Sequence, residues 1–147
     1  MKFEHLDEIH TQTIGDNLWL ITQEYNAYCL HERKPLLIKI SAGFKTDFCT
    51  VPRLPFVYWF LGNMGKAAGL IHDALYSNYN GIHIYYPETG EPHFFDRRAA
   101  DKIFLFALIY LKMPWWKCHI MYLTVRLIGN LYYKKDSQAD HELSLVK

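Results

Sequence analysis

A histidine, an aspartate and a tyrosine lie close together in the segment His72-Asp73-Ala74-Leu75-Tyr76. The surrounding residues, about 64–79, predict a helix because alanine and leucine are strong helix formers. A helix would place His72 and Tyr76 on one face, with Asp73 one step around it. Such a histidine can act as a base near neutral pH, and the aspartate can bind a hard divalent cation. A histidine on a partly apolar helix is also a common core residue, so this segment alone does not establish a catalytic site.

A second carboxylate, Asp101, interrupts an apolar surface. On a predicted helix over 97–112, Asp101 shares one face with Phe104, Leu105 and Leu108. Burying a carboxylate is costly unless it is paired or bound to a cation. Two partners are open, Arg97 one turn earlier on the same helix and His72 on a neighbouring helix. We expect the second, with His72 and Asp101 within hydrogen-bonding distance on antiparallel helices.

Residues 43–63 predict a long loop, because glycines and prolines recur through them. The loop contains many aromatic residues, which indicates that it lies against the core. Its polar candidates are Thr46, Asp47, Thr50 and Arg53. Asp47 could bind a cation and Arg53 could hold a carboxylate or phosphate, whereas an ion pair between these two residues is the simpler alternative. We expect both side chains to point inward, near the helical histidine.

The elements that would position these residues predict an α+β protein. Short antiparallel strands are expected over 18–25 and 36–40, in the N-terminal third. Three helices follow, with a β-hairpin between the first two. The predicted elements after the first helix are hairpin arms at 82–86 and 92–95, a helix over 97–112 that Asp96 caps, and a helix over 115–134. We expect one domain over 1–147, with residues 135–147 as a flexible or partner-bound tail.

Composition and charge exclude several classes of protein. The 147 residues carry 16 Lys and Arg against 15 Asp and Glu, a balance that is too even for a strongly electrostatic nucleic-acid binder. The content of 11 Tyr, 9 Phe and 4 Trp excludes a disordered chain. Three widely spaced cysteines do not suggest a disulfide scaffold. The N-terminus is polar, which predicts no signal peptide, and the apolar stretch at 115–133 has too many polar interruptions for a transmembrane span.

Four motifs together resemble a family of phage and prophage proteins that is catalogued as domain of unknown function number 1353. They are Gly43-Phe44-x-Thr46-Asp47-x-x-Thr50-Val51-Pro52-Arg53, Ala68-x-x-x-His72-Asp73-x-x-Tyr76, Arg97-x-x-Ala100-Asp101-x-x-Phe104 and Met121-Tyr122-x-x-Val125-Arg126-x-x-Gly129. The resemblance covers about 36–130. It implies a protein made in the cytoplasm of a host bacterium, with incorporation into the virion left open, and it implies no established activity.

The pattern His72-Asp73-x-x-Tyr76, followed by a hairpin and a second helix, is also similar to secreted phospholipases of the A-two type. That resemblance implies His72 as the base, Asp73 as a calcium ligand and Tyr76 as a support. The aspartate that orients the histidine would be Asp96 or Asp101, and we select Asp101 for its apolar surroundings. The chain lacks the disulfides and the glycine-rich calcium loop of those enzymes, so Asp47 would have to supply a further ligand.

The sequence is compatible with two functions. The first is a non-enzymatic virion, tail or assembly component with a buried His/Asp network. Its partners would be other phage proteins bound through the aromatic C-terminal helix and the tail, and a membrane surface is a further option. The second is a metal-dependent hydrolase of phospholipids or cell-wall bonds. It would use His72 with Asp101, and calcium or another divalent cation on Asp73 and Asp47. Its substrate contacts would be Thr46, Thr50, Arg53 and Arg97. We favour the first function.

Overall fold

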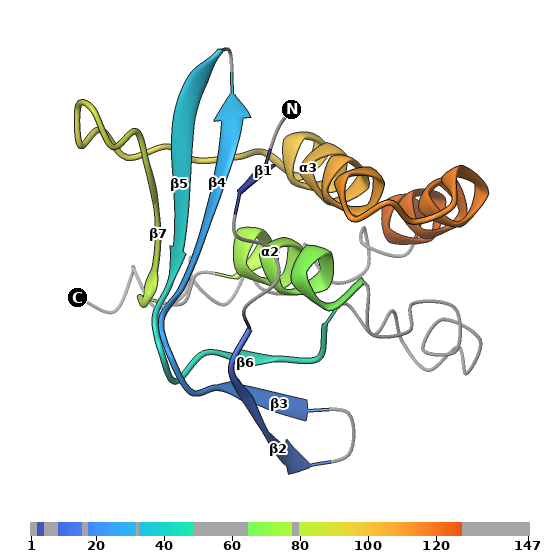
Figure 1. Cartoon of the computed structure of the whole chain (residues 1–147), viewed down its shortest axis with the longest axis horizontal. Helices are drawn as coiled ribbons and strands as arrows, with labels where there is room; N and C mark the ends of the chain where they lie inside the picture. Colours follow the sequence, from blue (N-terminus) through green and yellow to red (C-terminus); the bar gives the residue numbers. More distant parts are fainter. Residues whose placement is uncertain are drawn as a thin grey trace, which may run out of the picture.

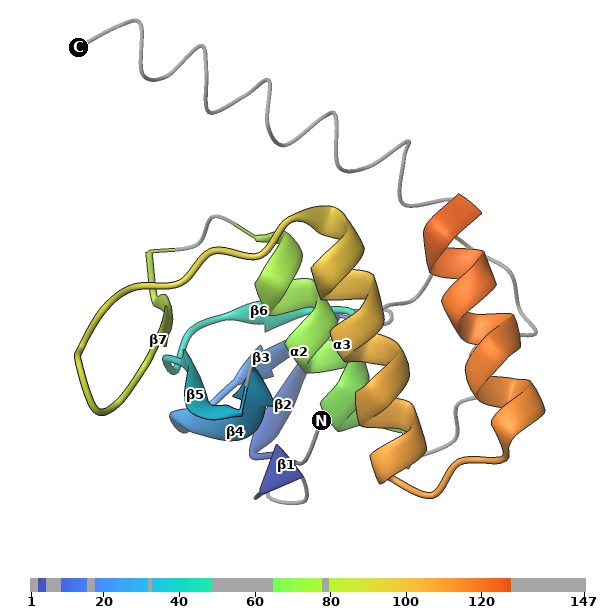
Figure 2. The ribbon, with the colours of Figure 1, turned by 90° about the horizontal axis from the view of Figure 1, so that it is seen from above.

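The computed structural model describes residues 3–4, 9–15, 18–31, 33–48, 65–77 and 80–127. Two small antiparallel sheets occupy the N-terminal part and helices follow, which confirms the predicted α+β class (Figure 1). Figure 2 shows α2 beside the strands, α3 beside α2, and the last described helix, over 115–127, beyond α3.

The larger sheet has four strands in the order β1-β4-β5-β7. Their bounds are β1 (Phe3–Glu4), β4 (Tyr25–His31), β5 (Lys34–Ile40) and β7 (Ile82–Tyr85). Ile38 of β5 lies opposite Ala27 of β4 on one side and Ile84 of β7 on the other. In β4, alternate residues are buried, because successive side chains of a strand point to opposite faces. One face of the sheet therefore supplies core residues to the helices.

The smaller sheet has three strands in the order β2-β3-β6. They are β2 (Thr11–Gly15), β3 (Leu18–Ile21) and β6 (Lys45–Thr46). The single strand predicted over 18–25 is wrong, since β3 ends at Ile21 and β4 begins at Tyr25 in the other sheet. Beyond the pairing of β3 with β6, the Ile21 amide donates to the Phe44 carbonyl, and the Gly43 amide donates to the Ile21 carbonyl.

The predicted helices are present, and the first two are shorter than predicted. They are α2 (Lys66–Tyr76), α3 (Arg97–Tyr110) and a helix over 115–127, while residues 128–134 of the third prediction lie outside the described residues. The Asp96 carboxylate accepts a hydrogen bond from the Ala99 amide at 2.7 Å, which confirms Asp96 as the N-cap of α3. Within the described ranges, no helix is both long enough and apolar enough to cross a bilayer.

The segment between α2 and α3 forms only part of the predicted hairpin. Its first arm is β7, but its second arm reduces to one bridge between Tyr85 and Pro92, together with a hydrogen bond from the His93 amide to the Ile84 carbonyl. Proline lacks the amide hydrogen that a continuing ladder needs. The other edge of β7 pairs with β5, so the chain returns to the first sheet after α2 and then crosses to α3.

Candidate functional site

Asp101 is the centre of a buried polar network. Its side chain is fully buried, at 0% exposure. One carboxylate oxygen, Oδ1, lies 3.1 Å from His72 Nε2 and also accepts a hydrogen bond from the Tyr76 hydroxyl. The other oxygen, Oδ2, accepts from Arg126 Nη1 at 3.0 Å and lies 3.9 Å from Arg97 Nε. The predicted contact between His72 and Asp101 is therefore confirmed.

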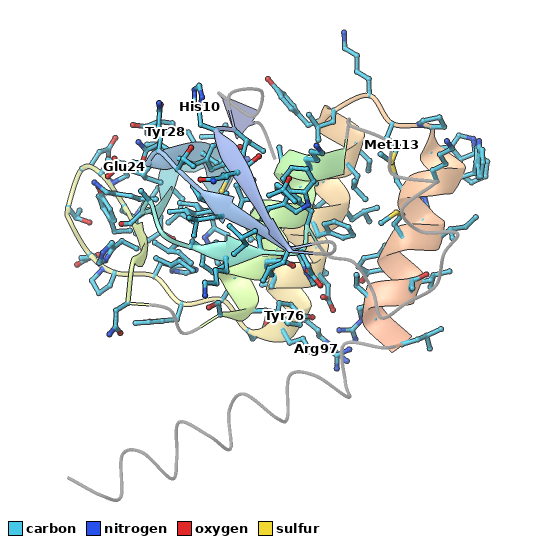
Figure 3. The ribbon with its side chains drawn as sticks, turned by 90° about the horizontal axis from the view of Figure 1, so that it is seen from below. His10, Glu24, Tyr28, Tyr76, Arg97 and Met113 are labelled. Atoms are coloured by element: carbon cyan, nitrogen blue, oxygen red, sulfur yellow. The ribbon has the colours of Figure 1, made fainter. Side chains whose placement is uncertain are left out.

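Two antiparallel helices position this contact. Tyr76 meets Arg97 and His72 meets Asp101, so chain direction is opposite in α2 and α3. Figure 3 shows the side chains of Tyr76 and Arg97 close together, and Arg97 Nε donates to the Tyr76 hydroxyl at 3.3 Å. The His72 ring packs between Tyr76 and Phe104, with ring centroids 4.2 and 4.9 Å away. Aromatic packing and the carboxylate together fix the orientation of the imidazole. Because an ionised carboxylate only accepts, Nε2 carries the hydrogen.

Of the two candidate partners for the histidine, Asp101 is the one that contacts it. Asp96 is exposed and its carboxylate caps the first turn of α3. Arg97, which the sequence offered either as a substrate contact or as an ion-pair partner of Asp101, belongs to the network. Its Nη2 also donates to the backbone carbonyl of Arg126.

Arg126 is the member of the network that the sequence reasoning did not select. It comes from the helix over 115–127, so the carboxylate of Asp101 joins side chains from three helices. Its signal in the sequence was a basic residue inside the fourth motif, one of two in the helix over 115–127, the other being Lys117. That pattern does not identify a partner, since nothing local to residue 126 indicates where the guanidinium points.

The electrostatics of the network favour an ionised Asp101. Burial raises the pKa of its carboxyl, but hydrogen bonds from His72, Tyr76 and Arg126 lower it by more, so the pKa lies below its ordinary value. The same hydrogen bond raises the pKa of the Arg126 guanidinium. Burial, and then the hydrogen bond to Asp101, raise the pKa of the Tyr76 hydroxyl, which stays protonated at neutral pH. The core of the network is thus a partly buried ion pair with two further donors on the carboxylate.

Asp73, next to the histidine, takes part in a second contact. Its Oδ2 accepts a hydrogen bond from the Thr46 hydroxyl, whose oxygen also accepts from the Phe48 amide at 2.9 Å. The backbone of Phe48 lies directly against Gly69 of α2, where an added Cβ would be 2.4 Å from the Phe48 carbonyl oxygen. Thr46 is buried, and its hydrogen bonds tie β6 and the residues after it to α2.

The expectation that Asp47 points inward is wrong. Residues 45–48 alternate between exposed and buried, with Thr46 and Phe48 inward and Asp47 exposed. Within β6, neighbouring side chains point to opposite sides, which turns Lys45 outward and Thr46 inward. Thr50 and Arg53, the remaining predicted loop contacts, lie outside the described residues.

The structure gives the predicted cation site few ligands. Among the described residues, no group of three or more His, Cys, Asp or Glu side chains could hold a metal ion. Asp73 is bound to the Thr46 hydroxyl and Asp47 is exposed. A cation on Asp73 and Asp47 would need ligands besides these two carboxylates. The metal role of Asp73 and Asp47 stays a prediction, as do the catalytic roles of His72, Asp101 and Tyr76.

Comparison with known proteins gives one match. Residues 19–125 match the family model described as Protein of unknown function (DUF1353). No curated protein and no solved structure matches the chain significantly. The matched range contains the contact of His72 with Asp101 and the contact of Asp73 with Thr46. It ends one residue before Arg126.

Proposed function

The chain belongs to the DUF1353 family of unknown function, and from its buried network we propose that it is a non-enzymatic structural or binding component. The observation that carries the proposal is that the fully buried carboxylate of Asp101 accepts hydrogen bonds from His72, Tyr76 and Arg126. A base for hydrolysis has to reach a substrate and water, whereas His72 is 5% exposed. The carboxylate that would support this histidine is already neutralised by an arginine.

A network of this kind holds secondary elements in place. Buried polar groups that are fully hydrogen-bonded favour one packing arrangement, because any other leaves them unsatisfied. Here the network connects α2, α3 and the helix over 115–127. The phage setting of the proposal comes from the four motifs: the protein would be made in the host cytoplasm and act in a virion, a tail or its assembly, with other phage proteins as partners.

Thermal unfolding of the wild type and of His72→Ala tests this proposal, in calcium, in zinc and in chelator. We expect a wild-type melting temperature that the additions do not change. His72→Ala should lose about 1–3 kcal/mol in every condition, because it leaves Asp101 with one donor fewer. His83→Ala, on the exposed side of β7, is the matched control and should melt like the wild type. Stabilisation of the wild type by calcium or zinc, with a His72→Ala variant of unchanged stability, would overturn the proposal.

A metal-dependent hydrolase is the second candidate, and one observation favours it. His72 Nε2 and the Tyr76 hydroxyl share the same oxygen of Asp101, with Asp73 next along the helix, as the resemblance to A-two-type phospholipases implies. The direct assay measures fatty-acid release from mixed phospholipid micelles, with and without calcium. Calcium-dependent release that His72→Ala abolishes without loss of circular dichroism, and that Asp73→Asn weakens, would establish this function in place of the first.

A further inference from the structure

The helix over 115–127 is apolar on two opposite faces. The buried face carries residues three and four positions apart, Cys118, Met121 and Val125, which belong to the core. The other face carries an exposed stripe, defined as Trp116, Ile120, Leu123 and Leu127, whose exposed fractions lie between 43% and 75%. Their spacing of four, three and four residues places them in one line along the helix. A helix on the surface of a globular protein ordinarily has one apolar face, so the exposed stripe indicates a binding surface.

The charged residues of the helix over 115–127 and of the turn before it all have one sign. Residues 102–135 contain six Lys or Arg and no Asp or Glu, although the whole chain is nearly neutral. Lys112 is exposed at the turn before the helix, and Lys117 Nζ lies 5.5 Å from the centre of the Trp116 ring. Trp115, at the start of the helix, is 73% exposed. The helix over 115–127 and the turn before it thus combine aliphatic side chains, indole rings and ammonium groups, and these described residues include no Asp or Glu.

We propose that the exposed stripe binds the surface of an anionic lipid bilayer, with the helix lying in the plane of the interface. Tryptophan rings and long basic side chains are suited to this position, since each has an apolar body and a polar end. Aliphatic residues provide the apolar area that enters the headgroup boundary. A protein partner fits less well, because lysines and other charged residues are depleted in the core of protein interfaces, whereas the described helix over 115–127 presents its lysine beside the indole rings.

The buried network fixes which face of this helix points outward. Arg126 donates to Asp101 of α3, while Cys118, Met121 and Val125 pack into the core. These contacts prevent the helix from rotating about its long axis, so the exposed stripe stays exposed. The inference goes beyond the proposed function, since it requires a rigid helix and not a particular role for the histidine.

Co-sedimentation of the full chain with lipid vesicles tests the proposal. We expect binding to vesicles of phosphatidylcholine with phosphatidylglycerol, binding at least tenfold weaker to phosphatidylcholine alone, and release by high salt. The double variant Ile120→Ser/Leu123→Ser should bind at least tenfold more weakly and melt close to the wild type, because both side chains are exposed. Phe94→Ser is the matched control, since Phe94 is 87% exposed outside this helix, and it should bind like the wild type.

A second measurement covers the case in which the double variant does not fold. Lipids with brominated acyl chains quench tryptophan emission only inside the bilayer, so they should quench the wild type, and Trp115→Phe/Trp116→Phe should remove most of that quenching. No binding to either vesicle, or binding that neither double variant reduces, would overturn the proposal. Self-association without vesicle binding would also overturn it, and would assign the stripe to a second copy of this chain if Ile120→Ser/Leu123→Ser abolished the association.

Discussion

Replacement of Asp101 by asparagine changes the charge of the network with almost no change in shape. The amide can accept from one donor through its remaining oxygen, but its NH₂ group faces a second donor, so a buried hydrogen bond is lost. A buried donor without a partner costs about 1–3 kcal/mol, and a hydrogen bond to a charged group contributes about 1.5–3 kcal/mol. The side chain of Arg126 is 30% exposed and can turn to water, which reduces its share of the loss.

A further effect acts in the opposite direction. Asparagine removes the cost of burying a charge, so the loss should lie at or below the 3–5 kcal/mol that is typical when one partner of a buried ion pair is removed. We therefore expect Asp101→Asn to lower the free energy of unfolding by about 2–4 kcal/mol. For a chain of this length, each kcal/mol corresponds to roughly 2–4 °C in melting temperature, so the midpoint should fall by about 5–15 °C.

Urea and thermal unfolding at pH 7, followed by circular dichroism, measure this loss. Glu88→Gln makes the same change of carboxylate to amide at an exposed turn residue and should leave the midpoint unchanged. Asp101→Asn should lower the urea midpoint with the same dependence on urea concentration, because the fold is retained. A loss below about 1 kcal/mol would refute the reasoning, since it would mean that the three hydrogen bonds to Asp101 contribute almost nothing to stability.

Three further predictions concern pH and packing. The lowered pKa of Asp101 adds stability that is complete above about pH 5 and is lost as the pH falls below the unfolded value near 3.9. The difference in melting temperature between the wild type and Asp101→Asn should therefore narrow from pH 6 to pH 3, and a constant difference would contradict this. Gly69→Ala should cost about 1–3 kcal/mol in urea unfolding, because its Cβ would overlap the Phe48 backbone, whereas Gly15→Ala, with its nearest neighbour at 3.9 Å, should cost much less. Thr46→Val should lower the free energy of unfolding by about 1–3 kcal/mol, because it removes a buried hydroxyl that makes two hydrogen bonds. Thr46→Ser should recover part of that loss, and equal stability of the two variants would exclude the hydroxyl as its cause.

Much of the network could be predicted from the sequence because its main residues lie on regular helices. Helical spacing alone places His72 and Tyr76 on one face, and the same spacing places Asp101 in the middle of an apolar face. The cost of burying a carboxylate then requires a partner nearby. The N-cap at Asp96 was equally local, since the cap bonds to an amide three residues away.

The tertiary structure decided the features that depend on contacts between distant segments. Strand β3 ends at Ile21, and its pairing partners are residues 43–46, which no pattern within 18–25 reveals. Arg126 joins Asp101 only because a third helix packs beside α3, and Asp47 points to solvent only because Thr46 takes the inward position against α2. Periodicity in a sequence fixes which residues share a face of one element. The pairing of faces is fixed by the packing of the whole chain, where many weak contacts act together.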